Sequence, residues 1–134
     1  MQFKVNWLQE GSQFEAINET GGTIKIDADS KDTGQSPMEL LISAIGGCSA
    51  IDVISILEKQ KQTLKSLEVV VDADRQSVGT YSEYKTIHMH YILSGDLDPN
   101  KVQKALDLSI QKYCSVSKVM EKSSEITYDF EIVD

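Results

Sequence analysis

The sequence is poor in basic residues. Of its 134 residues, 13 are lysine or arginine and 21 are aspartate or glutamate, so the formal net charge is −8. An acidic surface repels phosphate backbones, and no run of basic residues interrupts this one. We therefore expect no nucleic-acid partner.

The N-terminus lacks the long apolar stretch of a secretory signal, because residues 1–7 mix polar and apolar side chains. We therefore expect a cytoplasmic protein in surroundings that keep thiols reduced. The chain has only two cysteines, Cys48 and Cys114. In a reducing compartment they are expected to be reactive or inert thiols rather than a permanent disulfide.

Length and composition predict one globular domain over residues 1–134. Alternating and turn-bounded segments predict strands over residues 3–8, 13–18, 23–27, 67–73, 86–93 and 126–132. Helices are predicted from residues 36 and 98, with polar connections over 29–35 and 76–83. The order βββ-α-ββ-α-β indicates an α+β fold with antiparallel sheet.

The first predicted helix is unusually long and apolar. Ser36 and Glu39 form a capping-box pattern with Pro37 at the first helical position, and the helix is expected to end near Lys61. Apolar side chains over residues 40–57 cover nearly every face, so we expect burial all round. A helix of about 40 Å is too long for so small a domain to cover, which predicts a homodimer. The internal Asp52 and a soluble-type cap argue against a membrane span.

The second half of the chain has clear period-2 and helical patterns. Residues 86–93 place alternate apolar side chains on one strand face, and Asp98 with Pro99 is expected to cap the second helix. The predicted inner face of that helix comprises Val102, Ala105, Leu106 and Ile110. Ser115 or Ser117 could cap a further short turn.

Each cysteine has a different predicted setting. Cys114 lies at a helix junction near Lys112 and Lys118, where positive charge would favour a thiolate. Cys48 shares a helix face with Asp52, whose charge would disfavour a thiolate unless a cation intervenes. Free cysteines are also often small buried hydrophobes. The sequence alone does not bring the two thiols together.

The two histidines, His88 and His90, lie on one face of a predicted strand. Zinc needs three or four ligands, and no third ligand is spaced to join them. We expect a solvated strand face there, and no metal or cofactor in this protein.

Two segments resemble the OsmC/Ohr family of bacterial redox proteins. One runs from Ser36-Pro37 through Glu39-Leu40-Leu41 to Gly47-Cys48, and the other is Tyr113-Cys114-Ser115-Val116-Ser117-Lys118. The resemblance extends over essentially the whole chain. It implies an OsmC-like intertwined homodimer, in which antiparallel sheets wrap around long central helices.

The resemblance also implies a chemistry. In peroxidase members, a first cysteine attacks an organic hydroperoxide and becomes a sulfenic acid, a second forms a disulfide with it, and an external dithiol restores both. By position these are Cys48 and Cys114. The members also use an arginine, held by a glutamate, to stabilise the thiolate. Here Arg75 is the only arginine and lies outside the family position, and Glu39 is displaced by one residue.

These departures leave the function open between two classes. The first is a cytoplasmic thiol redox protein linked to oxidative stress. In its most concrete form it is a weak peroxidase with Cys48, Cys114 and Glu39 at its site. Its partners would be a small organic hydroperoxide and a dithiol reductant, and Lys4, Lys25 or Arg75 could supply the cation. The alternative is a non-catalytic protein of the same fold that binds a small apolar ligand or senses oxidation.

Overall fold

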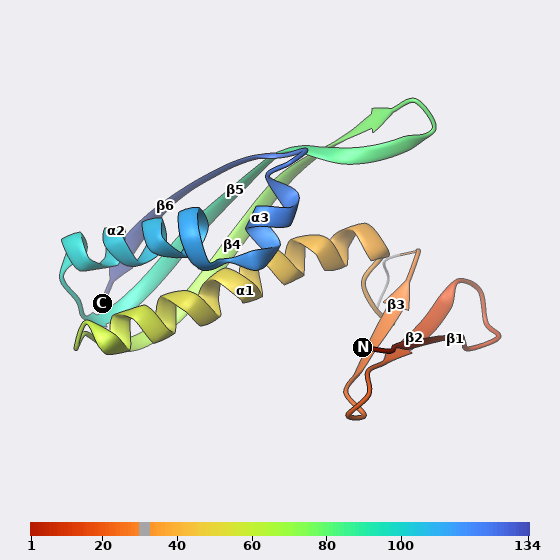
Figure 1. Cartoon of the computed structure of the whole chain (residues 1–134), viewed down its shortest axis with the longest axis horizontal. Coiled ribbons are helices and arrows are strands. Elements are labelled where there is room, and N and C mark those ends of the chain that lie inside the picture. The colour runs from red at the N-terminus through yellow and green to blue at the C-terminus, as the bar shows by residue number, and fades with distance from the viewer. Residues whose placement is uncertain (30–32) are drawn as a thin grey trace. The chain divides into compact units, whose positions relative to one another are not determined.

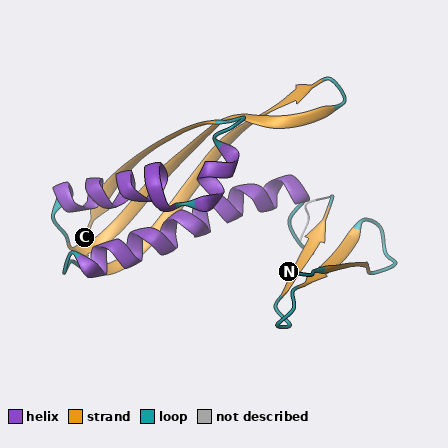
Figure 2. Ribbon diagram, viewed as in Figure 1, coloured by secondary structure: helices purple, strands orange, loops and turns teal. Residues whose placement is uncertain are grey.

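The computed structural model describes residues 1–29 and 33–134, so part of the predicted connection over 29–35 lies outside the described residues. The chain forms two compact units, Met1–Leu41 and Ile42–Asp134. The secondary structure is shown in Figure 2. The α+β class predicted from the sequence is confirmed, with two three-stranded sheets.

The first unit is built on a small antiparallel sheet. Strands β1 (Lys4–Trp7), β2 (Gln13–Ile17) and β3 (Thr23–Asp27) pair in the order β1-β2-β3, within one residue of the predicted bounds. Gly11 and Gly21 have φ values of 52° and 92°, which side chains with a Cβ rarely adopt, and they close the two turns. Several large apolar side chains of this unit are exposed, among them Phe3, Val5, Trp7 and Ile24.

Helix α1 (Pro37–Lys59) starts in the first unit and continues into the second. Its capping box is confirmed: the Ser36 amide donates to Glu39 Oε1 at 2.8 Å, and the Glu39 amide donates to Ser36 Oγ at 3.2 Å. The helix ends two residues before the predicted position. Lys61 there has a left-handed φ of 59°, and such a residue commonly follows a helix.

The single chain buries only one side of α1, so burial all round stays a prediction that depends on a second subunit. Its buried residues are Ile45, Gly46, Ser49, Val53 and Leu57. Ile51 is 70% exposed and Ile54 47%, because the other elements of one chain cover only one side of the helix. By length and composition α1 could cross a membrane, with a mean hydropathy of 2.1 and 28% of its most apolar window buried, but core helices of soluble proteins meet the same criteria.

The second unit contains a mixed sheet. Strands β4 (Thr63–Val78), β5 (Tyr81–Asp96) and β6 (Glu125–Val133) pair in the order β4-β5-β6. The antiparallel prediction holds for β4 and β5 but is wrong for β6, which runs parallel to β5. The predicted connection over 76–83 is also wrong, since both strands continue through it to a tight turn at Gly79.

Three helical segments of the second unit lie on one face of this sheet (Figure 1): α1, α2 (Pro99–Leu108) and α3 (Ser115–Met120). A π-helical turn, η1 (Ser109–Tyr113), joins α2 to α3. The predicted inner face of α2 is confirmed as buried, and so is the predicted apolar face of β5, comprising Ile87, Met89, Tyr91 and Leu93. Burial of each valine, leucine, isoleucine or methionine side chain among them stabilises the fold by about 1.5–3 kcal/mol.

Candidate functional site

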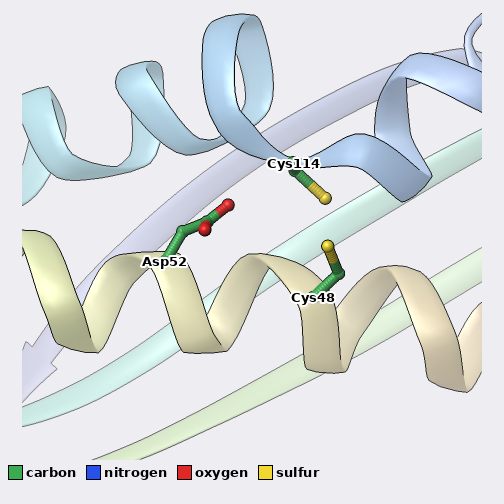
Figure 3. Close-up of side chains that lie close together, drawn as sticks. All are labelled: Cys48, Asp52 and Cys114. Atoms are coloured by element: carbon green, nitrogen blue, oxygen red, sulfur yellow. The ribbon is translucent and has the colours of Figure 1, made fainter.

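Helix α1 places Cys48 and Asp52 one turn apart on the same face, as the i, i+4 spacing predicts (Figure 3). Both side chains are partly buried. The helix therefore presents a thiol and a carboxylate side by side to the elements that pack against it.

Cys114 is positioned by the π-helical turn. Its backbone N–H closes that turn on the Ser109 carbonyl at 2.7 Å, and an extended conformation (φ −73°, ψ 103°) then starts α3. The residue is fully buried, and its Sγ accepts a hydrogen bond from the Ser117 amide at 3.4 Å. The cysteine itself is thus the N-cap of α3. The predicted serine cap is wrong, because Ser117 instead donates its hydroxyl to the carbonyl of Cys114 at 2.9 Å.

These elements bring three donor atoms together. The two sulfurs and a carboxylate oxygen of Asp52 all lie within 4.8 Å of one another. Figure 3 shows the sulfur atoms of Cys48 and Cys114 facing each other across the gap between α1 and the start of α3. Both cysteines are free thiols. The structure therefore juxtaposes two thiols 66 positions apart that the sequence could not show to meet.

The surroundings of Cys114 favour its neutral form. Burial raises the pKa of this thiol, and the neighbouring Cys48 thiol adds to the rise through a hydrogen bond. The hydrogen bond from the Ser117 amide acts in the opposite direction. A proton must therefore leave Cys114 before or as it reacts, since the thiolate is the nucleophile.

A chain of buried hydroxyl groups ends at Asp52. Ser109 Oγ lies 3.1 Å from Asp52 Oδ2 and 2.9 Å from Ser49 Oγ, which in turn lies 2.5 Å from the hydroxyl of Tyr91. Each hydroxyl donates one proton, so if Ser109 donates to the carboxylate, Ser49 donates to Ser109 and Tyr91 to Ser49. Burial raises the pKa of Tyr91 to about 12, so its hydroxyl keeps its proton and can donate a hydrogen bond to Ser49. This series of hydrogen bonds fixes the orientation of the Asp52 carboxylate.

Three of the five cations proposed from the sequence contact other groups. Lys112 lies over the Tyr113 ring, 5.1 Å from its centroid, and Lys118 pairs with Glu121 at 3.3 Å. Arg75 donates from Nε to Ser82 Oγ at 2.7 Å across the β4–β5 hairpin. Lys4 and Lys25 belong to the other compact unit. A role for Lys4, Lys25 or Arg75 beside the thiols stays a prediction.

Glu39 has a structural part in the fold. Its carboxylate accepts from the Ser36 amide in the capping box at the start of α1. The capping-box pattern predicts this structural role, and a catalytic role for Glu39 stays a prediction.

A hollow of about 560 Å³ adjoins the site on the Asp52 side. Besides Asp52 it is lined by residues of α1, α2 and η1, among them Ile56, Lys59, Lys104 and Tyr113. Its lining combines apolar side chains with two lysines, so a small anionic or amphipathic molecule would find complementary groups there.

The two histidines contact groups of the neighbouring strand that the sequence could not identify. In the parallel β5–β6 pair, His90 lies opposite Asp129, and one carboxylate oxygen of Asp129 is 2.7 Å from His90 Nδ1 and 3.0 Å from His88 Nε2. The hydrogen bond to Asp129 raises the pKa of His90 and lowers that of Asp129. Both histidines are solvated, as predicted, and lie on the face of the sheet away from the thiols.

Comparisons with known proteins agree with this architecture. The chain is 41% identical to Protein YhfA of Escherichia coli over 99% of this chain and 98% of YhfA. An OsmC-like protein from Mycoplasma pneumoniae has the same fold, with a TM-score of 0.82 over 100% of this chain and 99% of that one at 18% identity.

The same fold occurs in a Legionella pneumophila protein described as an organic hydroperoxide resistance protein OsmC, predicted redox protein. It matches with a TM-score of 0.73 at 12% identity, over 97% of this chain and 95% of that one. The sequence profile of the OsmC-like protein family matches residues 29–129, which is most of the chain. This chain therefore belongs to the OsmC-like protein family.

Proposed function

We propose that this protein is a thiol-dependent redox protein that reduces small organic hydroperoxides slowly, with Cys48 as the reactive thiol and Cys114 as its resolving partner. The observation that carries the proposal is the approach of the two sulfurs to within 4.8 Å. Membership of the OsmC-like family and the redox description of the Legionella relative support the same class of chemistry.

The difference in burial between the thiols supports this order of reaction. Cys48 is partly exposed, whereas Cys114 is fully buried. A hydroperoxide from solvent therefore reaches Cys48 first. Cys114, held as the N-cap of α3, is placed to attack the oxidised sulfur rather than the substrate.

The proposed reaction has three steps. The Cys48 thiolate attacks the outer peroxide oxygen, the O–O bond breaks, and the alcohol leaves with a proton, giving a sulfenic acid. The Cys114 sulfur then attacks the Cys48 sulfur, and hydroxide leaves with the Cys114 proton as water. A dithiol reductant finally reduces the disulfide by exchange and becomes a disulfide itself.

The rate should be low because the family arginine is missing. A cation beside the thiolate both stabilises it and orients the peroxide in the transition state. Losing an interaction of about 3 kcal/mol costs roughly two orders of magnitude in rate. We expect turnover about 100-fold below that of arginine-bearing relatives.

The proposal includes a cytoplasmic homodimer as the working form. The exposed apolar residues of α1, with Ile51 70% exposed, support a second subunit on that helix. A reducing compartment would supply the dithiol.

The test follows cumene hydroperoxide consumption with dithiothreitol in wild type, Cys48→Ser and Cys114→Ser. We expect no enzymatic rate in Cys48→Ser, and a single turnover without efficient recycling in Cys114→Ser. Mass spectrometry of wild type after mild peroxide should show the loss of two hydrogens in one chain. Separate sulfinic acids without a bridge, or a wild-type rate equal to that of a free-thiol control at every pH up to about 9, would contradict the proposal.

A ligand-binding function is the second candidate, and the 560 Å³ hollow beside Asp52 favours it. If the hydroperoxide assay fails while an amphipathic anion protects the partly exposed Cys48 from alkylation, ligand binding becomes the better description. Protection should then weaken in Lys104→Ala, since Lys104 lines the hollow.

A further inference from the structure

We propose that Cys48, Asp52 and Cys114 form a binding site for Zn²⁺ in the reduced protein. The inference uses the same thiols as the proposed redox function but does not depend on hydroperoxide turnover. It revises the expectation of no metal, because the sequence could not show that the third donor, Cys114, reaches the pair on α1.

The geometry is close to that of a zinc site. With bond lengths of about 2.3 Å to sulfur and 2.0 Å to oxygen, a tetrahedral zinc ion holds its sulfurs about 3.8 Å apart and a sulfur and an oxygen about 3.5 Å apart. The three donors here all lie within 4.8 Å of one another. A change of about 1 Å, within the reach of side-chain rotation, would close them around one ion.

The donor set also fits the ion chemically. Thiolate sulfur and carboxylate oxygen are both zinc ligands, and three protein ligands with one open position are typical of sites where zinc exchanges or binds a further molecule. The i, i+4 pair of Cys48 and Asp52 on α1 supplies two ligands from one rigid element. Cys114 supplies the third from a second element.

Outer hydrogen bonds hold two of the three ligands in place. Ser109 Oγ lies 3.1 Å from Asp52 Oδ2, which leaves the other carboxylate oxygen for a metal. The Ser117 amide donates to Cys114 Sγ at 3.4 Å. Such partners orient metal ligands and contribute to affinity in known sites.

The negative charge of the cluster also favours a bound divalent cation. With both thiols ionised, the cluster carries three negative charges on one fully buried and two partly buried side chains. Of the lysines around the cluster, Lys112 lies over Tyr113 and Lys118 pairs with Glu121. Lys59 and Lys104 line the hollow on the Asp52 side and could offset only part of the negative charge. A divalent cation would offset that charge and deprotonate the thiols, including the buried Cys114. Zinc and a disulfide exclude each other, so bound zinc would protect the thiols until oxidation releases it.

The experiment titrates reduced, oxygen-free protein with Co²⁺ as a spectroscopic probe and then adds Zn²⁺. We expect visible bands of tetrahedral cobalt with a sulfur-to-cobalt charge-transfer band, loss of both on adding Zn²⁺, and release of about two protons per ion near neutral pH. Cys48→Ser should lose most of the charge-transfer band. Asp52→Asn should weaken Co²⁺ binding at least about tenfold while both thiols remain.

Two controls separate this site from others. Asp72→Asn removes an exposed carboxylate of β4, and the double variant His88→Ala, His90→Ala removes the imidazoles that could bind metal on the other sheet face. Both should bind Co²⁺ like the wild type. Absence of the charge-transfer band, unchanged affinity in Asp52→Asn, or loss of binding in the histidine variant would overturn the proposal. Hydroperoxide turnover is assayed on metal-free protein, so its failure would leave a positive cobalt result intact.

Discussion

The burial of Tyr91 makes the free energy of unfolding depend on pH at high pH. Tyr91 is fully buried, its hydroxyl lies 2.5 Å from Ser49 Oγ, and its pKa is raised to about 12. The unfolded chain would release the same proton near pH 10. Between these two values the folded state holds a proton that the unfolded state has lost, so the free energy of unfolding falls as the pH rises.

Replacing Tyr91 by Phe should therefore change the slope of stability at high pH. The contribution of Tyr91 is fully present below pH 10 and is lost by pH 12, a decrease of about 2–3 kcal/mol. Tyr91→Phe should cost about 1 kcal/mol at pH 8 through the lost hydrogen bond, and should then lose stability less steeply above pH 10. Urea unfolding at pH 8, 10 and 11 measures both effects. Tyr81→Phe, at a 63% exposed position, should keep the wild-type slope, and equal slopes in all three proteins would contradict the explanation.

At the scale of elements, patterns within one segment were predictable and pairings between segments were not. The capping box of Ser36 and Glu39 depends on residues three apart, so the sequence contains all of it. The parallel direction of β6 was missed because alternation marks a strand but not its partner. The end of β4 was missed because residues 74–78 are exposed on both faces and leave no apolar alternation. Cys114 as the cap of α3 was missed because sulfur is a weak acceptor that cap rules omit.

The capping box gives a prediction that separates the two interpretations of Glu39. Ser36→Ala should lower the free energy of unfolding by about 1 kcal/mol, because it removes an acceptor from the first turn of α1. Glu39→Gln should be nearly neutral, since glutamine also serves at this position of the box. Urea unfolding and hydroperoxide turnover are measured on both variants. Unchanged stability with lost turnover in Glu39→Gln would mean that the carboxylate acts in the reaction rather than in the cap.

At the scale of the whole molecule, the single chain leaves apolar surface uncovered in both compact units. Phe3, Trp7 and Ile24 are exposed in the first unit, and Ile51 and Ile54 of α1 in the second. Large exposed apolar side chains that gather on one element often mark an interface between proteins. The apolar composition of α1, which by itself predicts complete burial, is explained if a second copy covers the side that its own chain leaves open.

The final prediction is that the folded protein is a dimer whose interface includes α1. Ile51→Glu would be a mild surface change in an isolated chain, at about 0.5 kcal/mol or less, but it would place a charge in an apolar interface of the dimer. We expect it to shift sedimentation equilibrium toward monomer and to make the melting temperature fall on dilution more steeply than in wild type. Thr80→Glu, which adds the same charge at an exposed turn of the β4–β5 hairpin, should keep wild-type association. A wild-type chain that sediments as a folded monomer at micromolar concentration would contradict the dimer, and with it the account of why α1 is apolar on all sides.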